Sequence, residues 1–326
     1  MQLDNMLLQA CKNNQKTVVQ MFLKRGDINV NKRDESGNTP LIYSCMKNAR
    51  ELVKMLLDSG ADANLSNVAT RYPLHFAAQT GNYEILSLLV GAGADVNCTD
   101  KEGVTPLMLL AQNGKTDTAL KFLKFDGVDV SLKDNNNNKA IDYATVAGLR
   151  ELVKALSSNI EEHTDANGNT TLHHACWNDQ VEVVKVLVDN GAEVDKVNDD
   201  GETALFLAVR RANLVTTEKL LSAGAKTDIS NLDGVMPIHI AADSGEQFIG
   251  VALINAGADI NAKTSDGYTS LILAARNGRN DFTAMLIEKG ADVNAVDNEQ
   301  HSALYYASEA GFTEIVEQLL MAGAMN

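Results

Sequence analysis

A repeat with a period of 33 residues runs through nearly all of this 326-residue chain. It is clearest over residues 264–296, which read TSDGYTSLILAARNGRNDFTAMLIEKGADVNAV. Related units begin at Asp34, Asn67, Asp100, Asp134, Asp165, Asn198, Asn231, Thr264 and Asp297, and most of these starts are 33 residues apart. Self-similarity at such a period indicates a repeat architecture, so it constrains the fold more than composition does.

Each unit predicts a turn followed by two short helices. In the unit from Thr264, a turn at Gly267 leads to Thr269, whose hydroxyl can cap the first helix. Apolar residues then recur at helical spacing, Gly278 breaks the first helix, and Gly290 ends the second. Two helices of about ten residues cannot enclose a core by themselves, so the units must stack on one another.

The start of the first helix carries a recurring motif. It reads Thr39-Pro40-Leu41, Tyr72-Pro73-Leu74-His75, Thr105-Pro106-Leu107 and Met236-Pro237-Ile238-His239. With the 33-residue period, this motif resembles the ankyrin repeat over essentially the whole chain. The resemblance implies an all-α solenoid of stacked helix-turn-helix units with β-hairpin-like turns.

Glycine placement supports the repeat prediction. All but two of the 23 glycines fall in the opening turn, between the helices or after the second helix. The exceptions are Gly91 and Gly250. A globular chain would scatter its glycines, so most of these glycines are predicted to serve turns and helix ends.

The repeats predict a capped stack with one irregular member. Residues 1–33 lack the opening turn and predict an N-terminal capping helix pair, residues 34–164 contain repeats one to four, and residues 165–326 contain repeats five to nine. The fourth repeat lacks both the motif and the terminating glycine, leaving Asn159 as the candidate left-handed residue. We expect weaker coupling between two sub-stacks at this junction.

Two further departures from the period are visible. The third repeat has one additional residue, which we expect in the turn between Gly114 and Ala119. The last repeat ends just after Gly323 and looks like an internal unit, although terminal repeats usually have a more polar outer side. We therefore expect the native chain to continue past Asn326.

Charge and cysteine content exclude several classes of protein. A net charge of -15 disfavours binding to nucleic acid or an anionic membrane, and no segment has the roughly 20 apolar residues of a membrane span. The amino terminus lacks the basic start of a signal peptide. The four cysteines lack metal-ligand spacing and are expected to be free thiols in a reducing compartment. We expect a cytoplasmic or nuclear monomer without membrane insertion, metal or cofactor.

Several local patterns imitate a catalytic or ligand site. Residues 91–93 follow a helix rather than the strand that a dinucleotide loop requires, and residues 165–169 lack the later glycine and glutamate of a calcium loop. His173 shares its repeat position with His75 and His239, where the resemblance implies hydrogen bonds to neighbouring turns. No nucleophile has a base placed by the sequence, so we expect no catalytic residues and no enzyme activity.

The positions that the repeat leaves free predict a binding surface. In ankyrin-like stacks, the turn tips and the exposed ends of the first helices form a concave surface where partners generally bind, as the resemblance implies. The candidate partner-binding residues on it are Trp177, Arg210, Arg211, Asp243, Tyr268 and Arg276. Aromatic and arginine side chains are the usual anchors of interfaces, so this stripe suits a protein or peptide with apolar and acidic residues.

Two alternatives remain at the sequence level. Trp177 could instead fill space left by the irregular repeat, with the arginines paired to Asp199, Asp200 and Asp243. At the level of function, we expect a non-catalytic scaffold or adaptor. The alternative is a targeting or regulatory segment of a larger enzyme, ubiquitin-ligase adaptor or channel that continues beyond residue 326.

Overall fold

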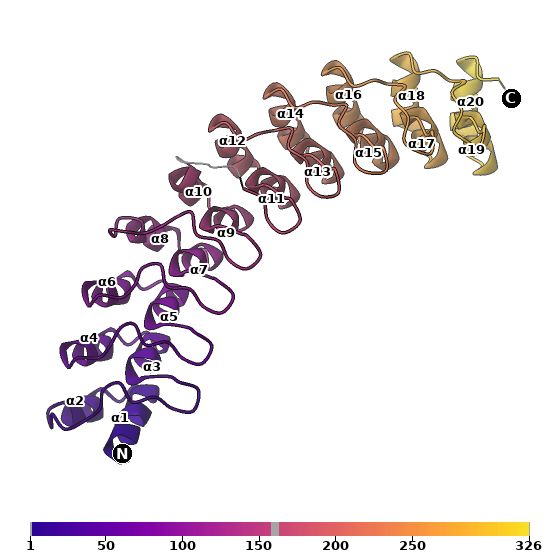
Figure 1. Ribbon diagram of the computed structural model, residues 1–326. Helices are drawn as coiled ribbons and strands as arrows, with labels where there is room; N and C mark the ends of the chain where they lie inside the picture. Colours follow the sequence, from indigo (N-terminus) through magenta and orange to yellow (C-terminus); the bar gives the residue numbers. More distant parts are fainter. Residues whose placement is uncertain (1, 158–162, 326) are drawn as a thin grey trace. The chain divides into compact units, whose positions relative to one another are not determined.

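The computed structural model describes residues 2–157 and 163–325, and the chain forms two compact units, Met1–Asn159 and Ile160–Asn326 (Figure 1). The N-terminal unit contains α1 (Gln2–Lys12), α2 (Lys16–Leu23), α3 (Pro40–Met46), α4 (Arg50–Asp58), α5 (Pro73–Thr80), α6 (Tyr83–Gly91), α7 (Pro106–Gln112), α8 (Thr116–Phe122), α9 (Ala140–Val146) and α10 (Arg150–Leu156). The C-terminal unit contains α11 (Thr171–Trp177), α12 (Val181–Asp189), α13 (Ala204–Arg210), α14 (Leu214–Ser222), α15 (Pro237–Ser244), α16 (Gln247–Asn255), α17 (Ser270–Arg276), α18 (Asn280–Glu288), α19 (Ala303–Glu309) and α20 (Thr313–Met321). Asn159, the candidate left-handed residue, lies outside the described residues.

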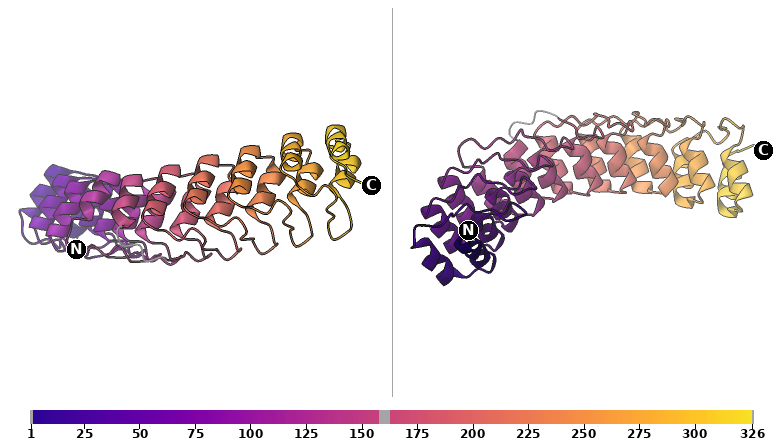
Figure 2. Two further views of the ribbon diagram at one scale, coloured as in Figure 1. Left: turned by 90° about the horizontal axis from the view of Figure 1, so that it is seen from above. Right: turned by 60° about the horizontal axis from the view of Figure 1, so that its bottom comes forward.

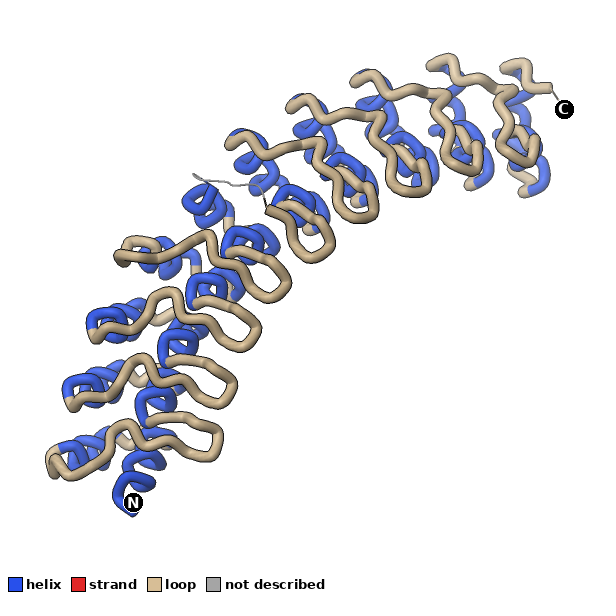
Figure 3. Tube along the Cα trace, viewed as in Figure 1, coloured by secondary structure: helices blue, strands red, loops and turns tan. Residues whose placement is uncertain are grey.

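Within each unit the helices form two rows (Figures 1 and 2). Each first helix, with an odd number, packs on its paired second helix and on the first helix of the next repeat. The turns extend from the row of first helices (Figure 3). The described residues contain no strand, but three turns close with single antiparallel bridges, Val197–Thr203, Lys263–Thr269 and Val296–Ser302. The predicted all-α stack with hairpin-like turns is confirmed.

The helix starts show how the motif can vary. The Oγ1 atom of Thr269 accepts the N–H of the third helical residue at 3.3 Å, as predicted. Where threonine is missing, the third helical side chain accepts the cap N–H instead: Tyr72 donates to Nδ1 of His75 at 3.2 Å, and Lys139 donates to Oδ2 of Asp142 at 2.8 Å. The irregular fourth repeat therefore keeps a hydrogen-bonded helix start without the motif.

Buried histidines link successive turns. The Nε2 atoms of His75, His173 and His239 each lie 2.9 Å from a backbone oxygen in the following turn, and their Nδ1 atoms accept a cap N–H. Because Nδ1 accepts, Nε2 carries the proton. Burial lowers the pKa of all three imidazoles, which favours this neutral form. The predicted structural role of His173 is confirmed.

The glycines divide as the sequence predicted. Every glycine except Gly91 and Gly250 has a positive φ. At Gly168, with φ of +75°, an added Cβ would also lie 2.8 Å from the backbone nitrogen of Asp199 in the next turn. Glycine here allows both the left-handed backbone and the close approach of two turns.

The position predicted for the additional residue of the third repeat is wrong. The loop between α7 and α8, residues 113–115, is as long as the corresponding loop between α3 and α4, residues 47–49. The extra residue follows α8 instead, where Phe125 packs edge-on against Phe122 with ring centroids 5.5 Å apart. A shortened helix end and an aromatic pair accommodate the insertion, so the turn between the helices is unchanged.

All four cysteines, Cys11, Cys45, Cys98 and Cys176, are free, as expected, and all four are buried. Burial raises the pKa of each thiol, that of Cys11 to about 12, so the thiols stay protonated. In the part of the chain that the structure describes, no helix is both long enough and apolar enough to cross a bilayer.

Candidate functional site

The surface that the turns border is built from a recurring pair of positions. The residue just before the helix cap lies beside the residue eight positions later, at the end of the first helix. Glu202 forms an ion pair with Arg210, and the Tyr268 ring lies 5.4 Å from Cζ of Arg276. The exposed first-helix ends and the preceding turns therefore form one surface, called here the turn-facing surface. Sequence reasoning listed both positions but missed their pairing, although the eight-residue spacing recurs in every repeat.

Trp177 forms the first cluster on this surface, at the end of α11. Its side chain is 47% exposed, and Cζ of Arg210 and of Arg211 lie 6.0 and 5.7 Å from the ring centroid. Arg210 is paired with Glu202, and Arg211 lies 3.6 Å from a carboxylate oxygen of Asp179. Three of the candidate residues thus lie together, and both guanidinium groups already have a carboxylate partner.

These contacts bear on the alternative that Trp177 only fills space and that the arginines pair with carboxylates of the chain itself. Both arginines do form ion pairs within the chain, as that alternative requires. Their partners are not the carboxylates that it named, Asp199, Asp200 and Asp243, so that detail is wrong. The reason is local, because Glu202 precedes α13 in the same repeat as Arg210. Nearly half of the Trp177 side chain still contacts solvent, which is more than a space-filling role requires.

A pocket of about 360 Å³ opens beside Trp177. Arg210 and Asp200 form part of its wall, and the buried residues His173 and Leu207 lie at its base. The volume is at the lower end of the range for ligand pockets and is large enough for one side chain. Trp177 therefore borders a preformed hollow and can pack against an inserted group.

Arg276 forms the second cluster, at the end of α17. Its Cζ lies 5.4 Å from the Tyr268 ring centroid and 5.9 Å from that of Tyr306, and the two rings are 6.1 Å apart. Among the described residues, no carboxylate lies within ion-pair distance of Arg276. The aromatic faces hold this cation by cation–π contacts and leave its charge unneutralised.

Tyr306 is a member of this cluster that the sequence did not single out. Its hydroxyl donates to Oδ2 of Asp297 at 2.6 Å. Burial, together with this hydrogen bond, raises the pKa of Tyr306, so the phenol stays neutral beside Arg276. Its contacts with Tyr268 and Arg276 of the preceding repeat, rather than its own sequence context, make it a member of the cluster.

Asp243 lies apart from both clusters, in the last turn of α15. Its Oδ1 accepts the amide Nδ2–H of Asn277 at 2.7 Å. No lysine, arginine or histidine of the described residues forms an ion pair with it. The six predicted residues thus form a cluster of three, a cluster of two and a separate carboxylate.

Backbone hydrogen bonds fix the edge of the turn-facing surface in the C-terminal unit. At each step an N–H of one turn donates to a carbonyl of the previous turn at 3.1 Å: Asp199 to Asn167, Leu232 to Asp200, Ser265 to Asp233 and Asn298 to Asp266. The series is unbroken over five successive turns. A surface held in this way loses little conformational entropy when a partner binds.

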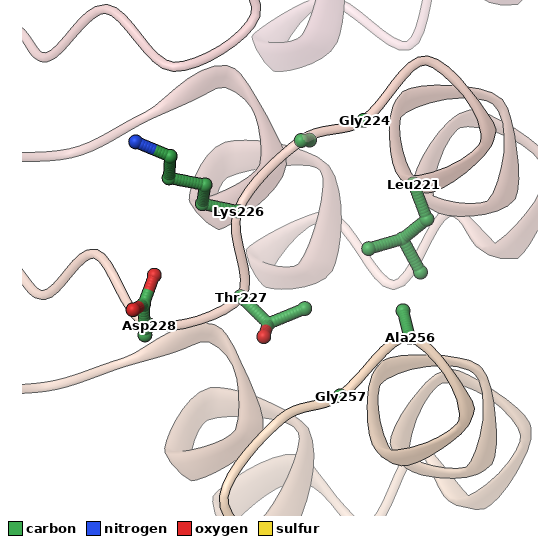
Figure 4. A pocket seen from close by; sticks show the side chains of 8 residues that line it. Leu221, Gly224, Lys226, Thr227, Asp228, Ala256 and Gly257 are labelled. Atoms are coloured by element: carbon green, nitrogen blue, oxygen red, sulfur yellow. The ribbon is translucent and has the colours of Figure 1, made fainter.

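A second pocket, of about 490 Å³, lies beside the C-terminal ends of the second helices α14 and α16 (Figure 4). Gly224 and Gly257 are part of its lining. In other repeats an asparagine closes the corresponding place: Asn64 accepts the N–H of Asp95 at 2.9 Å and donates Nδ2–H to the oxygen of Gly93 at 2.8 Å. The Asn64 side chain therefore links two successive loops by hydrogen bonds.

Aspartate replaces that asparagine at Asp228, which lines the pocket, and one repeat earlier at Asp195. The Oδ1 atom of Asp195 accepts the N–H of Lys226 at 2.8 Å, but a carboxylate cannot donate to Gly224. We therefore expect Asp195→Asn to raise the free energy of unfolding by about 0.5–1 kcal/mol, through one added hydrogen bond. Urea denaturation measures the change. Asn64→Asp is the reverse change in a repeat that has the asparagine, and it should destabilise by a similar amount. If both changes shift the free energy of unfolding in the same direction, this explanation is wrong.

The described residues hold no group of three or more histidine, cysteine, aspartate or glutamate side chains placed to bind a metal ion. Family comparison gives the class of the chain. A family model described as "Ankyrin repeats (3 copies)" matches residues 2–67, 74–163, 151–233, 172–264, 213–297 and 238–326, and one described as "Ankyrin repeats (many copies)" matches residues 45–90. The chain belongs to the ankyrin-repeat family. Ankyrin repeats are generally protein-binding domains and are not themselves catalytic.

Individual relatives match parts of the chain. Human "Transient receptor potential cation channel subfamily A member 1" is 27% identical over 174 residues, covering 50% of this chain and 16% of the channel. Fowlpox virus "Putative ankyrin repeat protein FPV223" is 32% identical over 96 residues, covering 29% of this chain and 68% of the viral protein. "E3 ubiquitin-protein ligase hecd-1" of Caenorhabditis elegans is 30% identical over 86 residues, covering 26% of this chain and 3% of the ligase. The chain thus covers a small part of the channel and of the ligase.

Proposed function

We propose that this chain is a non-catalytic scaffold or adaptor that binds a protein segment on the turn-facing surface of its C-terminal unit. The observation that carries the proposal is Trp177, which is half-exposed beside a preformed pocket. The proposed contact residues are Trp177, Arg210, Arg211, Asp243, Tyr268 and Arg276. Their aromatic and cationic groups suit a partner with apolar and acidic residues.

The proposed mechanism is rigid presentation. The hydrogen-bonded turns hold the surface before the partner arrives, so affinity comes from a few anchors rather than from ordering the receptor. The protein acts as a monomer without a cofactor. Four buried free thiols fit a reducing compartment, so we propose the cytoplasm, with the nucleus as the alternative.

Affinity capture tests this function. Trp177→Ala should leave the urea midpoint within experimental error of wild type, because the ring is half-exposed, and should lower partner capture at least tenfold because interface tryptophans carry much of the binding energy. Phe248→Ala is a matched control, since Phe248 is a 76% exposed aromatic side chain on the second helix α16, outside the turns and first-helix ends that form the proposed surface. Unchanged capture by Trp177→Ala, or a large loss of stability with normal capture, would favour the structural alternative.

A second candidate is a targeting or regulatory segment of a larger enzyme, ubiquitin-ligase adaptor or channel. The similarity to a human cation channel and to a worm ubiquitin ligase favours it. In this case the stack would position a catalytic or membrane domain, while the same surface could still bind a partner. Sequencing of the full-length transcript tests it: a reading frame without any further domain would exclude this candidate.

A further inference from the structure

One side chain per repeat marks the proposed partner's path along the C-terminal unit. The first helices α11, α13, α15, α17 and α19 present, at equivalent positions, Trp177, Arg210, Asp243, Arg276 and Glu309. The first is apolar, and Glu202 neutralises the second. The last three form no side-chain ion pair among the described residues, although Arg279 donates to the backbone oxygen of Asp243 at 2.9 Å. From α15 to α19 the surface therefore presents a negative, a positive and a negative charge in order.

We propose that the bound segment is an extended peptide whose charges complement this order. Building on the proposed function, the segment places an apolar side chain at Trp177, a basic one opposite Asp243, an acidic one opposite Arg276 and a basic one opposite Glu309. The acidic and apolar groups meet the two aromatic clusters described above. The two basic groups go beyond the proposed function, because aromatic and arginine side chains alone predict only apolar and acidic residues in the partner.

The repeat geometry sets the spacing of these groups. Packed helices lie roughly 8–10 Å apart, and an extended chain advances about 3.3 Å per residue. One repeat therefore corresponds to about three residues of the partner. Counted from the apolar anchor, the basic, acidic and basic residues fall about six, nine and twelve positions away, in either chain direction.

Charge order contributes selectivity more than affinity. Each exposed ion pair adds little to binding because water and salt screen it. A segment with the same charges in another order, however, brings like charges together at two positions, which disfavours the complex. Selectivity by charge order should therefore weaken as salt concentration rises.

A library of random sixteen-residue peptides displayed on phage tests the proposal with the full chain as bait. Selected peptides should share an apolar residue with a basic, an acidic and a basic residue about six, nine and twelve positions from it, in one chain direction or the other. One selected peptide, labelled with fluorescein, should bind Asp243→Arg/Arg276→Asp about tenfold more weakly than wild type in fluorescence anisotropy. The same peptide with its first basic residue and its acidic residue exchanged should prefer the variant.

A matched variant controls for charge exchange as such. Arg50 and Glu84 form an exposed ion pair in the N-terminal unit, and Arg50→Glu/Glu84→Arg also leaves the net charge unchanged. This variant should bind both peptides as wild type does. If Asp243→Arg/Arg276→Asp prefers the selected peptide over the exchanged peptide as strongly as wild type does, the charge-order proposal is wrong.

The outcomes separate this inference from the proposed function. If selected peptides need Trp177 but show no charge order, the inference fails and the binding surface stands. If selected peptides bind Trp177→Ala and the charge-exchanged variant as tightly as they bind wild type, both the inference and the proposed function fail. Both also fail if no peptide is enriched. Enrichment of the ordered pattern, lost on charge exchange, supports both.

Discussion

Replacing Gly250 with valine is expected to lower the free energy of unfolding of the C-terminal unit by about 3 kcal/mol, at the upper end of the usual cost of overpacking. Gly250 lies within α16 and has no role in a turn. A Cβ built on it would lie 2.6 Å from two ring carbons of Phe282, a fully buried residue of α18. The ring of the next repeat occupies the place of a side chain, so any substitution forces the two helices apart.

Gly91 provides the matched control, because it is the other helical glycine. No atom lies within 4 Å of a Cβ built on Gly91. Gly91→Ala should therefore stabilise the N-terminal unit by about 0.5–1 kcal/mol through reduced backbone entropy of the unfolded state, whereas Gly250→Ala should destabilise. Urea denaturation measures both changes. If the two alanine variants shift stability in the same direction, the proposed contact between α16 and α18 is wrong.

Phe122→Ala is expected to destabilise the N-terminal unit by about 3–5 kcal/mol, because it removes a fully buried ring from the core. We propose that the two compact units, divided near the irregular repeat, unfold separately. The chain's single tryptophan, Trp177, belongs to the C-terminal unit and reports on that unit alone. In urea, Phe122→Ala should lower the circular-dichroism midpoint that belongs to the N-terminal unit and leave the tryptophan fluorescence midpoint unchanged.

The reciprocal variant completes this test. Phe282 is equally buried, but in the C-terminal unit, so Phe282→Ala should move the fluorescence midpoint by a comparable free energy. If both variants shift circular dichroism and fluorescence together, the chain unfolds as one cooperative stack. The proposed division into sub-stacks would then be wrong.

The fold followed from the sequence because its signals are local and repeat. A capping hydroxyl such as that of Thr269 and the glycines after each helix act within a few residues of their own positions, so spacing alone reveals them. Gly250 does not belong to this set of local, repeating signals. Its role depends on a ring from the next repeat, which sequence spacing could not bring beside it. The site of the additional residue was missed because a helix end shortened instead of the expected turn growing.

The candidate site was predictable in position but not in its contacts. The repeat identified Trp177, Arg210 and Arg276 as exposed helix ends. It did not show that Glu202 neutralises Arg210 or that Tyr306 covers Arg276, because side-chain reach decides both contacts. The sequence predicted a stripe of aromatic and basic residues; in the structure, Trp177 with Arg210 and Arg211 forms one cluster, Tyr268 with Arg276 forms another, and the carboxylate of Asp243 lies between them along the row of first helices.

Fluorescence of Trp177 tests the central claim most directly, because the only indole of the chain lies at the proposed anchor. Titration of the intact protein with a captured partner segment should shift the emission to shorter wavelength, as the half-exposed ring leaves water, with the same midpoint as binding measured by anisotropy. Saturable binding that leaves the Trp177 emission unchanged would contradict the account, since the partner would then bind elsewhere.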